Sequence, residues 1–138
     1  MGATRHALIL AVVLVLSAVP VAAGPDMKDG SWEITTTTEM VGISMKMPPQ
    51  KHRQCLTKDD LVPKDPQAPE SCVVKEQRVS GNTVSWTMEC SSSNAKTVST
   101  GSVTYSGESF SGRVNITMPG TDIKILSTMT GRRLGPCQ

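Results

Sequence analysis

The chain has 138 residues, with 14 lysines and arginines against 12 aspartates and glutamates, and its aromatic side chains are two Trp, one Tyr and one Phe. Because the basic residues are scattered and aromatic residues are scarce, the composition lacks the basic patch and the stacking platforms of nucleic-acid-binding proteins. A chain of this length forms one domain with a modest core.

The N-terminal 23 residues have the pattern of a signal peptide. Residues 7–19 form an almost entirely apolar run that is shorter than the about 20 residues needed to span a bilayer. Residues 21–23 are the small residues that a signal peptidase recognises, so we predict cleavage after Ala23. The alternative is an uncleaved N-terminal anchor. We therefore expect residues 24–138 to form a single β domain, periplasmic or secreted, with no membrane span after cleavage.

The first strand patterns of this domain are interrupted by two prolines. Residues 31–41 alternate between apolar and polar positions, which predicts a half-buried strand. Residues 43–47 alternate as well, but Pro48 and Pro49 reduce this piece to an edge strand or a loop. Residues 50–56 resume as a strand.

A connecting segment follows. Thr57 is a plausible helix N-cap with an acidic residue, Asp60, three positions later, so we predict one short helical turn over residues 57–62. Residues 64–70 are rich in proline and form a connector.

The four cysteines, Cys55, Cys72, Cys90 and Cys137, are even in number, which favours two disulfides in an oxidising compartment. A three-residue hairpin loop at residues 80–82 places Cys72 directly opposite Cys90, within reach of a disulfide, and leaves Cys55 for Cys137. Two other pairings remain open by count. A zinc site is disfavoured because no C-x-x-C motif is present, and a redox pair lacks the close spacing that it needs.

The last strands have turns that predict their register. A two-residue loop at Gly107-Glu108 sets Tyr105 opposite Phe110 and Val103 opposite Gly112. A two-residue turn at Pro119-Gly120 sets Ile116 opposite Ile123 and Phe110 opposite Met129. Pro-Gly prefers a type II turn, which fits a two-residue hairpin poorly, so a longer loop or a bulge is the alternative.

These elements together predict an all-β fold. We expect a single-domain antiparallel meander of about seven strands, curled or barrel-like, because a flat sheet would leave its one apolar face in water. A β-sandwich is the alternative.

Several stretches together resemble a bacterial exported family, the domain of unknown function 3617. They are G-S-W-E-I-T-T-T-T-E-M, S-M-K-M-P-P, H-R-Q-C-L-T, V-T-Y-S-G-E-S-F-S-G and G-R-R-L-G-P-C, and the resemblance covers nearly all of residues 30–137. It implies an envelope or secreted bacterial protein with one small domain, and it supplies no catalytic residues.

The candidate chemistry is sparse. Met45 and Met47 share a strand face and, with His52, offer two thioethers and an imidazole that suit Cu(I), although methionine is also an ordinary filler of irregular cores. For a hydrolase-type enzyme, the expected domain has one histidine, set between Lys51 and Arg53, and no free thiol to pair with it. We therefore predict no catalytic residue and no cofactor.

The remaining hypothesis is binding without catalysis. A curled sheet with few bulky side chains can hold a small apolar ligand inside, or it can accept a strand of an envelope protein partner at residues 43–47. The alternative is an interior filled by its own side chains. The C-terminal Arg132 and Arg133 suggest an anion clamp, but neighbouring strand residues face opposite ways, so we expect the tail to be tied down by Cys137 instead.

Overall fold

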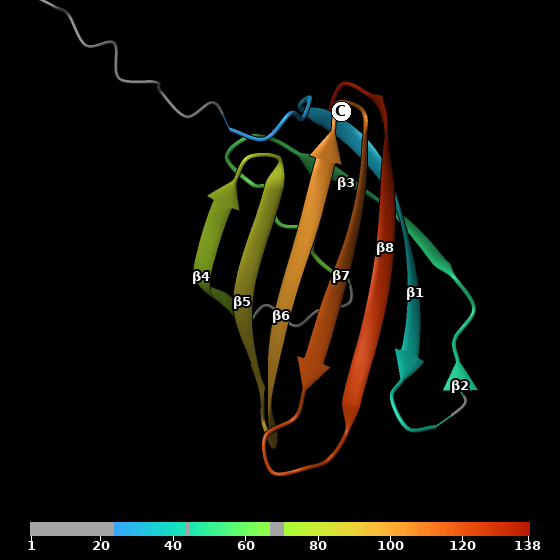
Figure 1. The fold of residues 1–138 in the computed structure, drawn as a ribbon, viewed down its shortest axis with the longest axis vertical. Helices are drawn as coiled ribbons and strands as arrows, with labels where there is room; N and C mark the ends of the chain where they lie inside the picture. Colours follow the sequence, from blue (N-terminus) through green and yellow to red (C-terminus); the bar gives the residue numbers. More distant parts are fainter. Residues whose placement is uncertain (1–23, 44, 67–70) are drawn as a thin grey trace, which may run out of the picture.

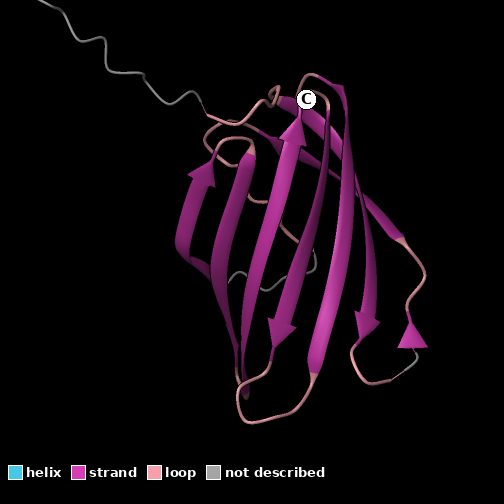
Figure 2. Ribbon diagram, viewed as in Figure 1, coloured by secondary structure: helices cyan, strands magenta, loops and turns pink. Residues whose placement is uncertain are grey.

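The computed structural model describes residues 24–43, 45–66 and 71–138, so the predicted signal peptide lies outside the described residues. Within them the chain forms eight strands and no helix (Figure 2). The strands are β1 Gly30–Met40, β2 Met45–Lys46, β3 Gln50–Leu56, β4 Cys72–Ser80, β5 Thr83–Ser92, β6 Ala95–Ser106, β7 Ser109–Thr117 and β8 Lys124–Gly135.

All eight strands belong to one antiparallel sheet with the order β2-β1-β8-β7-β6-β5-β4 (Figure 1). Strand β3 also pairs with β1, on the same edge as β2. The all-β prediction is confirmed, and β4 to β8 form the expected meander. The first strand departs from a simple meander, because β1 pairs along its whole length with the last strand, β8.

The edge beside β1 is broken as the two prolines predict. Strand β2 contains two residues, and β3 resumes at Gln50 after Pro48 and Pro49, which have no backbone N–H to donate to a ladder. The sheet is not closed into a ring of strands: β4 lies at one end of it, and β2 and β3 lie at the other.

The connector from β3 to β4 crosses from one end of the sheet to the other, and its first part packs into the core. Leu61 and Val62 are buried, and the Tyr105 hydroxyl donates a hydrogen bond to the Leu61 carbonyl at 2.6 Å. The predicted helical turn here is wrong. Residues 57–60 form a tight turn closed by a hydrogen bond from the Asp60 N–H to the Thr57 carbonyl at 3.0 Å. Only six residues, 57–62, lie between β3 and Pro63, and a helix this short is not stable by itself.

The sheet curls around a single core. The core combines residues of β1, β3 and β5 to β8 with Leu61 and Val62 of the connector and Met27 from the N-terminal segment. At its centre Trp32, Tyr105 and Phe110 form an aromatic cluster, with ring centroids 5.5 to 6.1 Å apart. The Phe110 ring lies where a Cβ on Gly131 would be, so this cluster depends on a glycine in the neighbouring strand.

The β4–β5 hairpin brings Cys72 opposite Cys90 as predicted, but by a different route. The loop has two residues, with Ser80 opposite Thr83, so a regular ladder would misalign the cysteines by one residue. A bulge at Lys75 shifts the register back, and the Cys72–Cys90 disulfide forms. The second disulfide joins Cys55 to Cys137, as the predicted pairing requires.

The predicted register is confirmed for one of the two later hairpins and is wrong for the other. The β6–β7 register is as predicted, with Tyr105 opposite Phe110. The β7–β8 register predicted from a two-residue turn is wrong by two residues, since Ile116 lies opposite Ile125 and Phe110 lies opposite Gly131. The Thr121 N–H bonds to the Met118 carbonyl, so the Pro-Gly turn sits inside a longer loop, which was the alternative.

Among the residues that the structure describes, none belongs to a helix long and apolar enough to cross a membrane.

Candidate ligand-binding face

Burial on the inward face of the sheet decreases from one end of the strands to the other. Strand β1 begins and β6 ends at the upper end of the sheet as drawn in Figure 1. Trp32 and Ile34, near the start of β1, and Tyr105, near the end of β6, are at most 1% exposed. Farther along the strands, Met40, Met88 and Ile116 face inward but are only half-buried. The upper part of the interior is therefore filled, whereas the lower part keeps apolar surface in contact with solvent.

Six half-buried inward side chains and the exposed Met45 lie in one line across the sheet, which we call the lower row. Register pairs connect its members from strand to strand: Met45 with Met40, Met40 with Ile125, Ile125 with Ile116, and so on to β4. Cross-strand partners share a face, so all these side chains point the same way. The lower row consists of Met45, Met40, Ile125, Ile116, Ser99, Met88 and Val74.

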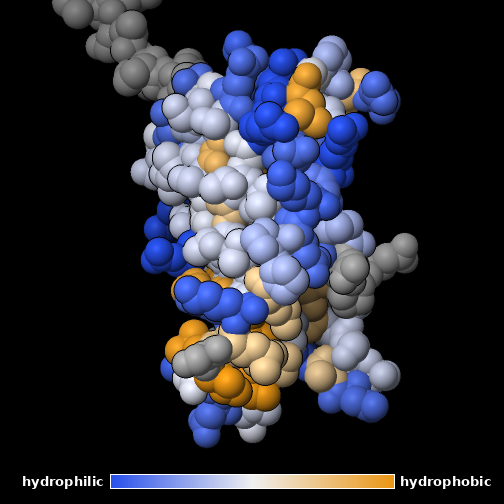
Figure 3. Space-filling model, turned by 90° about the vertical axis from the view of Figure 1, so that its right-hand side faces the viewer, coloured by the Kyte–Doolittle hydropathy of each residue, from blue (hydrophilic) through white to orange (hydrophobic). Residues whose placement is uncertain are grey.

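Exposed apolar side chains continue the lower row at the end of the molecule. We call Val41, Ile43, Met47 and Ile123 the apolar tip; each is at least 40% exposed. Val41 and Ile43 lie in the β1–β2 loop, Met47 in the β2–β3 loop and Ile123 in the β7–β8 loop. The β1–β2 loop is joined to the start of β8 by a hydrogen bond from the Val41 N–H to the Lys124 carbonyl at 2.9 Å. Figure 3 shows apolar side chains gathered at this lower end of the molecule.

A hollow adjoins the apolar tip. It has a volume of about 530 Å³ and is lined by residues 39–43, 45 and 46, including Met40 and Met45 of the lower row. The hollow shares Met40 and Met45 with the lower row, and Val41 and Ile43 with the apolar tip.

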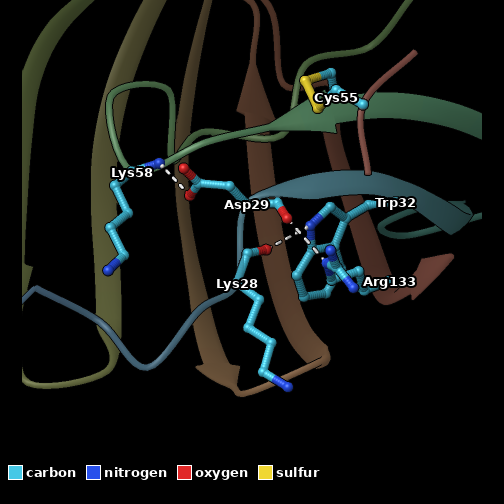
Figure 4. Close-up of a disulfide and its surroundings, with 7 residues drawn as sticks. Lys28, Asp29, Trp32, Cys55, Lys58 and Arg133 are labelled. Atoms are coloured by element: carbon cyan, nitrogen blue, oxygen red, sulfur yellow. Dashed lines mark hydrogen bonds between the residues drawn. A yellow bond between two sulfur atoms is a disulfide. The ribbon is translucent and has the colours of Figure 1, made fainter. Parts of the chain in front are cut away.

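The upper end of the interior is closed by polar contacts instead (Figure 4). The Trp32 indole donates to the Lys28 carbonyl at 3.2 Å, and the Arg133 Nε donates to the Asp29 carbonyl at 2.9 Å. The Asp29 carboxylate accepts the Lys58 N–H at 3.0 Å. These contacts hold the N-terminal segment over the upper end of the core.

The three candidate copper ligands are not brought together. Met45 is opposite Met40 on β1, whereas His52 is opposite Ile34 on the same strand. Six residues of strand separate these positions by about 20 Å, far beyond any distance at which one ion is shared. Met47 lies between them, with its N–H bonded to the Thr38 carbonyl.

His52 lies between Lys51 and Arg53 in the sequence, but it does not share their solvent-exposed face of the strand. Its side chain is on the inward face, and its Nε2 atom is buried without a hydrogen-bond partner within the described residues. No group of three or more His, Cys, Asp or Glu side chains in the described part of the chain is arranged to hold a metal ion.

The other polar candidates make structural contacts. Arg132 pairs with Glu33 at 3.0 Å, and Arg133 reaches Asp29 and Glu108, so the two arginines do not converge on one anion. Asp60 pairs with Lys64 at 2.9 Å. Burial raises the pKa of Tyr105 well above its usual value, and the nearby Asp60 carboxylate adds to the shift, so the phenol remains protonated and bonded to Leu61.

Sequence reasoning missed the lower row as a unit. The alternation of Val84, Trp86 and Met88 shows which face each side chain takes, but the alignment of Met40 with Ile125 depends on the pairing of the first strand with the last. The exposed methionines near Pro48 were the available signal, and they mark one end of the row.

Comparison with known proteins adds a family and no described activity. No curated protein and no solved structure matches the chain. The family model for the protein of unknown function DUF3617 matches residues 27–137, which covers all eight strands and both disulfides. The chain therefore belongs to the DUF3617 family.

Proposed function

We propose that this protein is a non-enzymatic binding protein that holds a small apolar ligand against the lower row. The observation that carries the proposal is the lower row itself, a line across the inward face of the sheet in which every side chain but that of Ser99 is apolar and which remains partly exposed. A domain of this size has enough apolar residues to fill its upper interior, yet it leaves this surface open at one end.

Exposed apolar surface of this kind is costly without an occupant. Covering it contributes about 25 cal/mol for each Å² removed from water, and contiguous exposed patches on soluble proteins commonly mark binding sites. Methionine and isoleucine side chains provide no directional polar contact, so the row favours an apolar ligand over a sugar or a nucleotide.

The compartment follows from the cysteines. Both disulfides are formed, which indicates an oxidising, exported environment. We propose export by cleavage of residues 1–23 and a periplasmic or secreted mature protein that begins at Gly24. Sequencing the N-terminus of the purified mature protein tests this, and an intact Met1 would contradict it.

The binding proposal is tested with two neighbouring residues of β8. Ile125 faces inward in the lower row, whereas Leu126 is a half-buried aliphatic residue on the opposite face. We expect the protein to bind the fluorescent apolar probe N-phenyl-1-naphthylamine saturably. Ile125→Asn is expected to weaken binding about tenfold or more, equivalent to about 1.4 kcal/mol, because a polar amide then faces the ligand.

Leu126→Asn is the matched control, with the same change in chemistry on the same strand, and it is expected to leave binding within about twofold. Equal weakening in both variants, with both still folded, would show that the probe reports stability and not the lower row. Absence of saturable binding to the unmodified protein would overturn the proposal.

The identity of the natural occupant is a separate measurement. Protein purified from its native envelope is analysed by mass spectrometry for co-purifying small molecules and proteins. A stoichiometric lipid-like molecule supports the proposal. A stoichiometric protein partner that is lost after Ile43→Asp substitution at the apolar tip would replace it with a docking function.

A further inference from the structure

We infer that the outward face of the sheet carries an oxyanion-binding site centred on Arg113. The site consists of the side chains of Arg113, Asn115, Thr100 and Ser102, and we call it the Arg113 site. It lies on the opposite face of the sheet from the lower row and does not depend on the proposed function. The inference is carried by the register of β6 and β7, by a hollow between these side chains and by their lack of partners.

Strand register places the four side chains together. Thr100 lies opposite Asn115, and Ser102 lies opposite Arg113, so the site consists of two neighbouring pairs of β6 and β7. Val114, between Arg113 and Asn115, is buried in the core, so these two residues and their cross-strand partners face outward. Partners have Cβ atoms about 5 Å apart, and successive outward residues are about 7 Å apart. One small group can therefore contact all four side chains.

An open hollow lies between these side chains. It is lined by the four residues of the Arg113 site and by Gly101, which separates Thr100 from Ser102 on β6. On the inward side, the Trp86 ring occupies the place where a Cβ on Gly101 would be. The core is therefore filled directly behind the hollow, and a ligand reaches the site from the outward side.

The side chains of the Arg113 site are unoccupied by the protein itself. None of the four has a hydrogen bond or an ion pair with another residue in the described part of the chain. Arg113 has the neutral partners Ser102 and Thr128 on the neighbouring strands. Its positive charge is therefore not compensated by a carboxylate.

The other arginines of the described residues are in a different environment. Each lies beside a carboxylate, either in an ion pair or as a cross-strand partner. These pairs are Arg78 with Glu76, Arg132 and Arg53 with Glu33, and Arg133 with Glu108. Arg113 is thus the arginine that remains available to an external anion.

The donors of the site match an oxyanion. A guanidinium carries a permanent charge and presents paired N–H groups that fit two oxygens of a carboxylate or a phosphate. The Asn115 amide and the hydroxyls of Thr100 and Ser102 add further donors around it. Arg113 disfavours a cation, and no aromatic ring is available to stack on a neutral sugar, because both Trp, the Tyr and the Phe are buried in the core. Since the site is exposed, we expect affinities in the millimolar range.

The test follows backbone amide chemical shifts by NMR while inorganic phosphate is added at constant ionic strength, with chloride as the balancing anion. We expect saturable shifts that are largest in residues 100–102 and 113–115. Arg113→Gln is expected to weaken binding about tenfold, because it removes both the charge and the paired N–H groups. Shifts that do not saturate, or that are centred elsewhere, would overturn the inference.

Arg78→Gln is the matched control. It removes the same charge from the same face of the sheet, at a position where Glu76 already compensates it. We expect it to change the phosphate affinity by less than about twofold. Equal weakening in Arg113→Gln and Arg78→Gln would mean that phosphate responds to net charge alone, and would overturn the site.

Phosphate esters and carboxylates share this chemistry, so glucose 6-phosphate and glucuronate are compared with glucose. Tighter binding of glucose 6-phosphate assigns the natural ligand to phosphate esters, and tighter binding of glucuronate assigns it to carboxylates. Glucose is expected to cause no saturable shift, and glucose binding as tight as that of either anion would overturn the requirement for charge. Ile125→Asn, on the opposite face, is expected to leave phosphate binding unchanged, so failure of the apolar probe and failure of phosphate to bind are separate results.

Discussion

At the scale of single residues, the fold depends on aromatic rings that lie against glycines in neighbouring strands. Phe110 covers Gly131, and Trp86 covers Gly101, each in direct register across one strand pair. The rings occupy the space in which other residues have a Cβ. With so few aromatic side chains in the chain, these contacts account for much of the upper core.

Gly131→Ala tests this arrangement. The added methyl group overlaps the Phe110 ring, which cannot move away because Trp32 and Tyr105 pack on its other sides. We expect the free energy of unfolding, measured by urea titration, to fall by about 1–3 kcal/mol. Gly24→Ala, where nothing lies nearby, is the control. Unchanged stability in Gly131→Ala would mean that the ring adapts freely.

Tyr105 gives a second test because it is the single tyrosine in the chain. Its folded-state pKa is raised, so the phenol contributes stability that is fully present below the unfolded value of about 10 and is lost as the pH rises above it. We expect the tyrosinate absorbance near 295 nm to appear only together with unfolding. Ionisation of the folded protein near pH 10 would contradict the buried hydrogen bond to Leu61.

Tyr105→Phe removes that hydrogen bond and leaves the Leu61 carbonyl without its donor. We expect a loss of about 1–3 kcal/mol in the free energy of unfolding and a weaker decline of stability above pH 10. Thermal unfolding monitored by circular dichroism across pH 8–11 measures both effects. If Tyr105→Phe has the same free energy of unfolding as the unmodified protein, and the same loss of it above pH 10, the phenol hydroxyl does not contribute to stability.

At the scale of elements, hairpin registers were predictable only where the loop was short and its turn type fitted. The β6–β7 hairpin met both conditions, so Tyr105 lies opposite Phe110 as predicted. In the β4–β5 hairpin, the predicted three-residue loop and the observed two-residue loop plus a bulge place Cys72 at the same position. A bulge has no signal of its own in a single sequence, because Lys75 is an ordinary strand residue.

Deletion of Lys75 tests the role of the bulge. The shortened strand forms a regular ladder with Cys72 still opposite Cys90, so we expect the disulfide to form, as judged by thiol titration. The edge strand is then flat, and flat edges pair with other chains, so light scattering is expected to show faster aggregation. Lys75→Gln keeps the bulge and is the control. Loss of the disulfide after deletion would contradict the register.

At the scale of the whole molecule, the two disulfides constrain very different lengths of chain. Cys72–Cys90 closes a loop within one hairpin, with a sequence separation of 18, whereas Cys55–Cys137 has a separation of 82. The longer loop is expected to contribute more to stability, in the range of about 2–5 kcal/mol. The Cys55→Ser, Cys137→Ser variant should therefore unfold at lower urea than the Cys72→Ser, Cys90→Ser variant. The opposite order would mean that the Cys55–Cys137 disulfide contributes less to the free energy of unfolding than the Cys72–Cys90 disulfide.

Strand content and the inward faces of the strands followed from alternation, and the disulfide pairs followed from spacing. The order of the sheet did not. Alternation is a local property, whereas the pairing of β1 with β8 joins residues at opposite ends of the domain. The lower row exists only because of that pairing, so neither its length nor its open end was accessible from the sequence.

The adjacency of the first and last strands also bears on how the chain folds. During synthesis β1 emerges early, with only β2 and β3 as local partners. The edge of β1 that pairs with β8 stays unpaired until β8, residues 124–135, has been synthesised. Cys137, which forms the disulfide with Cys55, follows soon after. Pairing between such distant segments is slow and leaves strand edges open to other chains. The sheet is therefore complete only after β8 has been synthesised. A chain truncated before β8 lacks the strand that lies between β1 and β7.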